Sequence, residues 1–407
     1  MDIRLKMNQR FTNLQGGLFA EVTKADVGEG AGRLMEQGYD ILAWADPFFP
    51  DPSLPESVAQ TMQEAFKIGC VSHYTMPIGN AELRRVIARK MKSVNGLAVD
   101  PCRNILITPG SDSGLIYSML PFLQEGDEVL IPDPSYPSNF LNARLCGATP
   151  VSVPLREENG WQPDIAEFEK RLTPRTKMVL ISHPNNPTST VFRRSNLEQL
   201  CSFIVENDLI LVSDQAFEDF IYDDVEFVTP AALPGMWERT VSVFSISKGI
   251  GLSGFRVGYV VAEDHIMDVL YGGTVNVLGA TNTAAQLGAI TAMQDESILQ
   301  NNYQILERRR RLAYDVFSSI PGVSMSLPES GFLSWLNISK LGTSAEVAAY
   351  ILREAKVVVN EGPPYGQYGE GYIRIVHGCF KDEDRALSAY RRIHKALNYL
   401  AGEKGIA

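Results

Sequence analysis

The sequence has no long apolar segment and few cysteines and histidines. Nowhere in its 407 residues is there an uninterrupted apolar stretch of about 18 residues, and the N-terminus lacks the apolar core of a secretory signal. The five cysteines are scattered and never form a C-x-x-C pair, which argues against a disulfide framework. The five histidines show no metal-binding spacing, so no metal is expected. We expect a cytoplasmic protein without membrane association.

Positive charge is also in deficit. The 37 lysines and arginines against 48 acidic residues give a net charge of −11. Such a chain repels phosphate backbones and anionic lipids, so nucleic acids and membranes are poor partners. The composition, 45% hydrophobic and 21% charged, is that of an ordinary globular protein, and about 100 to 200 residues per domain predicts two or three domains. Small molecules remain as the expected ligands.

A short apolar strand, a turn and a longer amphipathic segment recur along the chain, which is typical of an α/β fold. Six segments are predicted to be strands, most of them apolar on both faces: 105–108, 128–131, 178–182, 209–212, 241–244 and 257–261. Strands of this kind belong to a sheet that helices cover on both sides.

The pattern changes to a long helical stretch after about Thr281. We therefore predict a large domain at 47–285 and a smaller α+β domain made of 1–46 and 286–407, with a strand at 40–44. Four consecutive arginines, 308–311, spread around a helix and predict a solvated helix with salt bridges.

A lysine follows the strand at 241–244, in the segment SVFSISKGIGLSGFRVGYVV. Lys248 lies there among three glycines, the hydroxyl groups of Ser245 and Ser247, and Arg256 eight residues later. Hydroxyl groups and arginine bind phosphate, and glycines let a ligand approach the backbone. A lysine held near an aldehyde can form a Schiff base. Taken alone, however, the segment favours a surface lysine in a flexible loop.

Two upstream strands end in polar residues. The strand at 178–182 runs into HPNNPTS, which contains Asn186, and the next strand runs into SDQAF, with Asp214 at its tip. The carboxyl ends of parallel strands meet at one edge, so we expect both side chains to share a crevice with Lys248. There an aspartate can pair with a pyridinium nitrogen, and an asparagine can donate to a ring oxygen. Taken singly, a turn at Asn186 and a helix N-cap at Asp214 are equally consistent.

The segment ITPGSDSGL supplies a strand, a glycine turn and the start of a helix at 114–123. The N–H groups of Ser111 and Asp112 would point outward and can cradle a phosphate, although a simple capped helix is as consistent. Tyr136 follows the next strand. Its ring can lie on an aromatic ligand or be a buried structural tyrosine.

Together these motifs resemble those of the class I/II aminotransferases, fold type I enzymes that depend on pyridoxal 5′-phosphate. The resemblance runs from WADPFFPDP to YIRIVHG, nearly the whole chain, with the motifs in the family's order. It implies an α/β fold, with a mostly parallel seven-stranded sheet in the large domain. It also implies amino-group transfer between an L-amino acid, with aspartate as a first guess, and a 2-oxo acid. A homodimer with shared active sites is implied as well.

The resemblance assigns a role to each motif. Lys248 would form the Schiff base and carry the Cα proton, Asp214 would pair with the pyridine nitrogen, and Tyr136 would stack on the ring; these three are the expected catalytic residues. The residues expected at the cofactor are Lys248, Ser111, Asp112, Tyr136, Asn186, Asp214, Phe217, Ser245, Ser247, Arg256 and, from the neighbouring subunit, Tyr74. Those expected at the substrate are Arg374, which would clamp the α-carboxylate, Asn186 and Ala45.

Three positions depart from the family's pattern. Phe217 stands where the family usually has tyrosine, Ala45 where it usually has glycine, and Ser189 where it usually has the glycine of Asn-Pro-Thr-Gly. Without the phenol, the pKa of the cofactor's imine should rise, and Asn186 becomes the main donor to the ring oxygen. The methyl group of Ala45 narrows the carboxylate pocket.

Other reactions of the same carbanion stay open, because it can also eliminate a β-substituent or react with oxygen. A pyridoxal-phosphate-dependent β-lyase or amino-acid oxidase or deaminase is therefore the alternative, and Phe217 adds weight to it. A regulatory module attached to a DNA-binding domain is a third hypothesis, which the acidic balance disfavours. An acidic substrate would need a second cation, and no position clearly supplies one.

Overall fold

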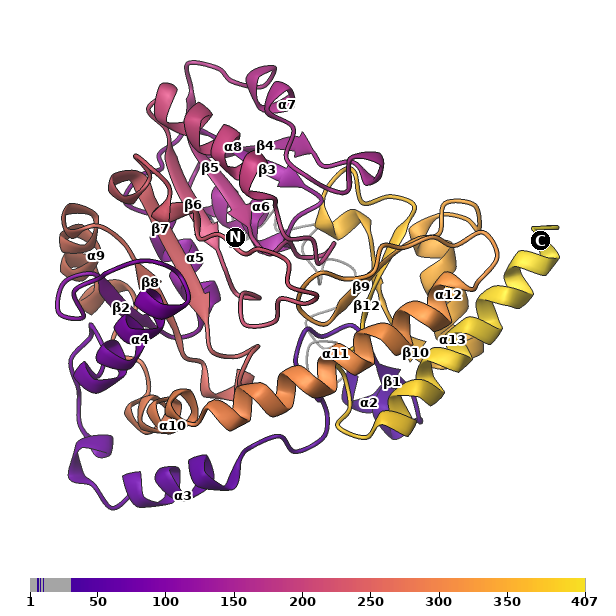
Figure 1. Cartoon of the computed structure of the whole chain (residues 1–407), viewed down its shortest axis with the longest axis horizontal. Coiled ribbons are helices and arrows are strands. Elements are labelled where there is room, and N and C mark those ends of the chain that lie inside the picture. The colour runs from indigo at the N-terminus through magenta and orange to yellow at the C-terminus, as the bar shows by residue number, and fades with distance from the viewer. Residues whose placement is uncertain (1–5, 7, 9, 11–30, 407) are drawn as a thin grey trace.

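The computed structural model describes residues 6, 8, 10 and 31–406, and a seven-stranded sheet forms the core of its larger region (Figure 1). In order across the sheet the strands are β2 (Ile105–Thr108), β8 (Gly258–Val261), β7 (Thr240–Ser245), β6 (Ile210–Asp214), β5 (Thr176–Ser182), β3 (Glu128–Asp133) and β4 (Thr149–Pro154). Strand β8 is antiparallel to both of its neighbours, and the strands from β7 to β4 are parallel. The predicted mostly parallel, seven-stranded sheet is confirmed.

Helices cover both faces of this sheet because its strands are apolar on both sides. Met178 and Leu180 of β5 pack in one core, whereas Val179 and Ile181 pack in another, as the period of two in a strand requires. The first core includes α5 (Ser111–Met119), α6 (Pro137–Leu145) and α9 (Asp264–Val277). The other face is covered by α7 (Ile165–Glu169), α8 (Arg194–Glu206), α4 (Ala81–Ser93), α3 (Glu56–Ala65) and α10 (Thr283–Gln294).

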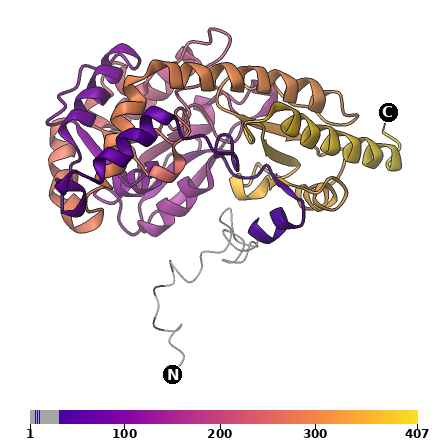
Figure 2. The same ribbon diagram turned by 90° about the horizontal axis from the view of Figure 1, so that it is seen from below.

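The smaller region has a three-stranded antiparallel sheet of its own. Its strands are β11 (Asn360–Glu361), β12 (Tyr372–Val376) and β9 (Leu333–Asn337), and its helices are α11 (Glu296–Ser318), α12 (Ser344–Ala355) and α13 (Glu383–Glu403). Figure 2 shows the two regions side by side, with α11 running along both. Among the residues that the structure describes, no helix is long and apolar enough to cross a membrane.

The start of the described chain belongs with this smaller region. After α2 (Ala31–Glu36), β1 (Asp40–Ile41) pairs in parallel with β10 (Val357–Val358). The strand expected at 40–44 therefore exists but is shorter. The predicted domain boundary at 285/286 falls inside α10 and stays a prediction. Most of residues 1–30, which the prediction assigned to the smaller domain, lie outside the described residues.

The arginine-rich helix corrects one expectation. Within 308–311, which lies in α11, Arg309 and Arg310 are 0% exposed. Arg309 donates to the carbonyl oxygen of Cys379 at 2.8 Å, and Arg310 pairs with Asp223 at 2.7 Å. The prediction of a solvated helix was wrong for these two arginines, because loop carbonyl and carboxylate oxygens bind their buried guanidinium groups. The predicted salt bridges are present, among them those of Arg308 and Arg311.

Candidate active site

A cavity of about 810 Å³ lies where the two regions meet. It is lined by ten of the thirteen residues that the sequence predicts for the site: Ala45, Ser111, Asp112, Tyr136, Asn186, Asp214, Phe217, Lys248, Arg256 and Arg374. The size is in the range for a cofactor or another small molecule.

Three of these residues follow neighbouring parallel strands. Asn186 comes after β5, Asp214 ends β6, and Lys248 comes after β7. Because β5, β6 and β7 are hydrogen-bonded side by side and parallel, their carboxyl ends meet at one edge of the sheet. All three residues line the same cavity, as the sequence predicted.

Lys248 lines the cavity and has few partners. Its Nζ donates to the carbonyl oxygen of Ala45 and lies 5.9 Å from the centre of the Phe217 ring. Burial lowers the pKa of the Lys248 amine, although the carboxylates of Asp112 and Asp46 act in the opposite direction. A lowered pKa increases the neutral, nucleophilic fraction of the amine, which is the form that attacks an aldehyde.

Asp214 is buried beside this amine. One of its oxygens accepts a hydrogen bond from the backbone N–H of Ala216 at 3.1 Å. Burial raises the pKa of the Asp214 carboxyl to about 7, and the nearby carboxylate of Asp112 contributes to the rise. A cation placed beside this carboxyl group would favour its charged form. A protonated ring nitrogen is such a cation.

Arg374, on β12, is almost completely buried and aimed at the cavity. Its Nη1 donates to Asn186 Oδ1 at 3.1 Å, its Nη2 donates to the oxygen of Ala43 at 2.8 Å and to Asn360 Oδ1 at 2.7 Å, and its Nε donates to the same Asn360 oxygen. The guanidinium also lies over the Tyr365 ring, 4.9 Å from its centre. A guanidinium has five N–H bonds, so these contacts leave one on Nη1 for a ligand.

The N-terminus of α5 and Arg256 form a compact cationic corner. A Cβ on Gly258 would lie 2.5 Å from the Ser111 nitrogen, and a Cβ on Gly110 would lie 2.4 Å from Arg256 Nη2. Glycine at 110 therefore lets the guanidinium approach the helix end, and glycine at 258 lets β8 approach it. The Asp112 carboxylate lies 3.7 Å from Arg256 but has the wrong charge to bind a phosphate. Only the backbone N–H of Asp112 suits an anion.

Two aromatic side chains complete this half of the cavity wall. Tyr136 precedes α6, and its hydroxyl donates to Asp112 Oδ1 at 3.0 Å. Burial raises the pKa of this phenol, so it keeps its proton. Phe217 is buried and packs against Phe332, with ring centres 5.4 Å apart. The phenol that the family usually has at this position is replaced by an apolar edge.

Three expected residues do not reach the cavity wall. Ser245 and Ser247 are buried behind it, where Ser245 Oγ accepts the backbone N–H of Ser247 at 3.1 Å. Tyr74 is fully exposed on the surface of the chain. Its position would suit a contact with a second subunit.

The loop after β5 is fixed at its base by a buried histidine. His183 is stacked between Phe192 and Phe227, with ring centres 5.2 and 4.9 Å away, and its Nδ1 accepts the backbone N–H of Phe192 at 3.3 Å. Burial lowers the pKa of His183 to about 3, so the ring stays neutral.

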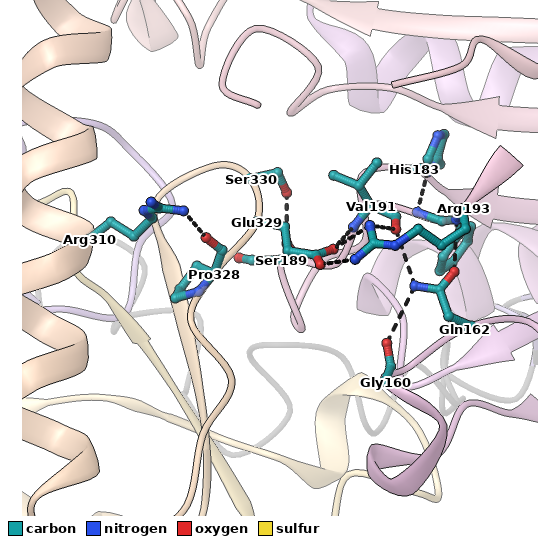
Figure 3. A network of polar contacts seen from close by, with 11 residues as sticks. Gly160, Gln162, His183, Ser189, Val191, Arg193, Arg310, Pro328, Glu329 and Ser330 are labelled. Carbon is teal, nitrogen blue, oxygen red and sulfur yellow. Dashed lines mark hydrogen bonds and ion pairs between the residues drawn. The ribbon is translucent and has the colours of Figure 1, made fainter. Parts of the chain in front are cut away.

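The same loop is tied to the smaller region through Ser189. Ser189 has a left-handed backbone (φ 58°), and its Oγ donates to the oxygen of Leu333 at 2.9 Å. Its own carbonyl oxygen accepts from the backbone of Glu329 at 3.1 Å and from Ser330 Oγ at 3.0 Å. The Glu329 carboxylate pairs in turn with Arg193, as Figure 3 shows. The loop that carries Asn186 is thereby bound to both regions.

Sequence reasoning missed several residues on the cavity wall. Asp46 follows the predicted Ala45 directly, so its place was within reach of the motif. Asn360 had no local signal, because only the pairing of β11 with β12 sets it opposite Arg374. The other residues that were missed are Leu34, Ile41, Ala43, Trp44, Leu115, Ala216, Ser253, Ala348, Ala349, Leu352, Val358, Val359 and Glu361.

Comparisons with known proteins agree with this geometry. The sequence profile of aminotransferase class I and II matches residues 42–390. An aspartate aminotransferase from Pyrococcus abyssi and aromatic-amino-acid aminotransferase 2 from Thermococcus litoralis are each 34% identical over 353 residues, covering 86% of this chain and 88% of theirs.

Solved structures are similar too. An aromatic aminotransferase from Pyrococcus horikoshii is 31% identical, with a TM-score of 0.84, over 92% of this chain and 100% of that one. The Thermus thermophilus aspartate aminotransferase with maleate is 26% identical, with a TM-score of 0.86, over 96% and 99% of the two chains. This chain therefore belongs to the class I and II aminotransferases, enzymes that use pyridoxal 5′-phosphate.

Proposed function

We propose that the cavity is the aminotransferase active site, in which Lys248 acts on the cofactor's aldehyde and the substrate Cα, Asp214 on the pyridine nitrogen and Arg374 on the α-carboxylate. The observation that carries this proposal is the convergence of one poorly paired lysine, one buried aspartate and one buried arginine on a single cavity. These groups match the aldehyde and the pyridine nitrogen of the cofactor and the carboxylate of an amino acid.

The residues fit pyridoxal phosphate by shape and by charge. The corner between α5 and Arg256 suits the phosphate. No side chain would fit at Gly110 or Gly258, which border this corner. We propose Ser111, the backbone of Asp112 and Arg256 as the direct contacts of that group, with Ser245 and Ser247 in supporting positions behind the wall. Tyr136 would stack on the ring and Phe217 would pack at its edge. The amide nitrogen of Asn186 would donate to the ring oxygen, because its Oδ1 already accepts from Arg374.

When bound, the cofactor supplies an aldehyde and a ring that accepts electrons. Lys248 would supply the amine for this aldehyde, and its free amine would be the base that takes the proton from the substrate Cα and returns it. Arg374 and Asn186 hold the α-carboxylate, so that the Cα–H bond faces this amine. Asp214 keeps a proton on the pyridine nitrogen. Ala45, whose oxygen accepts from Lys248 Nζ, borders the substrate. Two half-reactions of this kind give a ping-pong mechanism.

A single-turnover experiment tests this function. The cofactor-loaded enzyme receives an amino acid without any oxo acid, and ammonia and pyridoxamine phosphate are measured. We expect one equivalent of pyridoxamine phosphate and no sustained release of ammonia. Ammonia release over many turnovers would instead support the β-lyase or oxidase alternative, which Phe217 keeps open.

We also propose a homodimer with shared sites, in which Tyr74 of each subunit reaches the other's phosphate. An exposed apolar surface supports it: Phe66, Ile68, Tyr74, Met76, Val275 and Val277 are all exposed. Thr75 bonds Thr283 at 2.9 Å, which sets the 66–76 segment beside the junction of α9 and α10. Mixed dimers of Lys248→Ala and Tyr74→Ala chains test the sharing. One site of such a dimer would be intact, so activity should return on mixing.

We retain the cytoplasm as the proposed location. The thiols of Cys102, Cys146, Cys201 and Cys379 are free, which suits a reducing compartment. Cell fractionation with a compartment marker tests the proposal.

A further inference from the structure

We propose that the substrate is an L-amino acid with a neutral, apolar side chain, which packs against the part of the cavity formed by the smaller region. This inference rests on the function proposed above and goes beyond it, since it replaces the first guess of aspartate. It follows from how polar and apolar groups are distributed along the cavity wall.

The cavity has two unlike halves. The polar half, from the larger region, carries the phosphate corner, Asp214 and Lys248, and the cofactor would fill it. The other half includes the polar residues Asn360 and Glu361 of β11. Beside them lies a surface here called the apolar wall, made of Leu34 of α2, Ile41 of β1, Ala348, Ala349 and Leu352 of α12, Val358 of β10 and the adjacent Val359. Four separate elements of the chain thus contribute apolar side chains to this surface.

Arg374 marks the border between the two halves. Its guanidinium is bonded on one side to Asn186 of the larger region and on the other side to Asn360 of the smaller region. A substrate whose α-carboxylate binds Arg374 and whose Cα faces Lys248 has the cofactor on one side. The room left for its side chain is along the apolar wall, where burial of apolar surface is favourable.

The charges that a single chain supplies to the cavity do not favour an acidic side chain. Among the described residues that line the cavity, the cations are Lys248, Arg256 and Arg374, and the proposed function gives each of them a partner. The other charged lining residues are the carboxylates of Asp46, Asp112, Asp214 and Glu361. A second carboxylate on the substrate would therefore be buried against apolar groups and near like charges, without a counter-ion from the same chain, which is unfavourable.

Two pairs of substrates of similar shape test the inference. The cofactor-loaded enzyme receives L-leucine or L-aspartate, and L-methionine or L-glutamate, and the absorbance of the bound cofactor gives kcat/KM for each half-reaction. We expect the neutral member of each pair to react at least about 100-fold faster, as for sites that discriminate by side-chain burial.

The possible outcomes separate the two proposals. Faster reaction of aspartate or glutamate would overturn the apolar preference and leave the aminotransferase function standing. If none of the four amino acids is converted, the proposed function fails, and the inference that depends on it fails too.

A substitution on the apolar wall sharpens the test. Leu352→Lys adds a cation to the wall, so the ratio of kcat/KM for aspartate to that for leucine should rise at least about 10-fold. Leu352→Met, a neutral side chain of similar volume, should keep the preference for leucine. Cofactor absorbance verifies that both variants fold and load. An unchanged ratio in the lysine variant would count against the apolar wall as the side-chain site.

Discussion

Two groups of partly buried charged side chains lie close together in this protein, and they are paired very differently. In the first, Lys90 Nζ lies 2.6 Å from Glu218 Oε1 and 2.7 Å from Asp219 Oδ1, and Asn95 donates to the other Glu218 oxygen at 2.6 Å. In the second, Lys248 contacts a single backbone oxygen and Asp214 a single backbone N–H. A paired network stabilises the fold, whereas an incompletely paired one has capacity left for a ligand.

The pKa values of the two lysines differ in the same way. Burial alone would lower the pKa of Lys90, but the carboxylates of Asp219 and Glu218 outweigh it and raise that pKa well above its ordinary value. Burial prevails at Lys248 and lowers its pKa. The two lysines lie close to each other. Gly249, the residue after Lys248, lies so near Asp219, the partner of Lys90, that a Cβ on this glycine would be 2.2 Å from Asp219 Oδ2. The difference between structural and reactive lysine is thus set by the number of partners.

The largest expected effect is that of Lys248→Ala. It removes the amine that binds the cofactor and carries the proton, so kcat should fall by at least about 10⁴-fold. Borohydride reduction followed by mass spectrometry should find a pyridoxyl group on Lys248 of the unmodified enzyme and none in the variant. The melting temperature should not fall, because the lost amine had one partner. Retained activity or a marked loss of stability would break the comparison.

Lys90→Met should act on stability. It leaves the Glu218 and Asp219 carboxylates buried without their cation, which lowers the free energy of unfolding by about 3 to 5 kcal/mol. Urea denaturation measures the change. Lys92→Met, at an exposed position of the same helix, is the matched control and should change stability by less than about 0.5 kcal/mol. Equal effects of the two substitutions would show that the paired network is not structural.

Asp214 should make the cofactor-free protein sensitive to pH. Its pKa is about 7 when folded, against about 3.9 in an unfolded chain, so between these values the folded state binds more protons. Stability contributed by this group therefore falls as pH rises, by about 3 kcal/mol between about pH 5 and about pH 8. The difference in unfolding free energy between the unmodified protein and Asp214→Asn isolates this slope. A difference that is constant with pH would contradict the assignment.

Phe217→Tyr should have the smallest effect. The restored phenol would donate a hydrogen bond to the cofactor's ring oxygen and stabilise the negative charge on that oxygen. The pKa of the cofactor's imine, measured as the pH midpoint of the bound cofactor's absorbance, should therefore fall by about one unit. Phe217→Leu lacks the hydroxyl and should leave the midpoint unchanged. A tyrosine variant with the same midpoint as the leucine variant would show that position 217 does not reach the ring oxygen.

Much of the site could be predicted from the sequence because the site residues lie at or just after the ends of apolar strands. Lys248, Asp214 and Asn186 each come just after an apolar strand, and parallel pairing brings such positions to one edge. Asp46 could have been predicted in the same way, because it directly follows the predicted Ala45. Helix α5 begins at Ser111, three residues before the predicted start, because Gly110, at φ 81°, serves as its N-cap.

The parts that escaped prediction depend on long-range packing. Asn360 meets Arg374 only through the register of β11 against β12, and the apolar wall forms where α12 lies beside β1 and β10. The buried arginines of α11 escaped for the same reason, since helical periodicity does not tell which side other loops cover. β4, which begins with a threonine and a proline and stays half-exposed, lacked the apolar signal of its neighbours.

The bonds between Ser189 and Glu329 have a mechanical consequence. Asn186 lies three residues before Ser189 and touches Arg374, while Ser189 Oγ holds Leu333 of β9, the strand paired with β12. The amide of Asn186 and the guanidinium of Arg374 are thus coupled both directly and through Ser189 and β9. A movement of the smaller region on substrate binding would therefore shift both groups together, so a carboxylate bound at one would affect the position of the other.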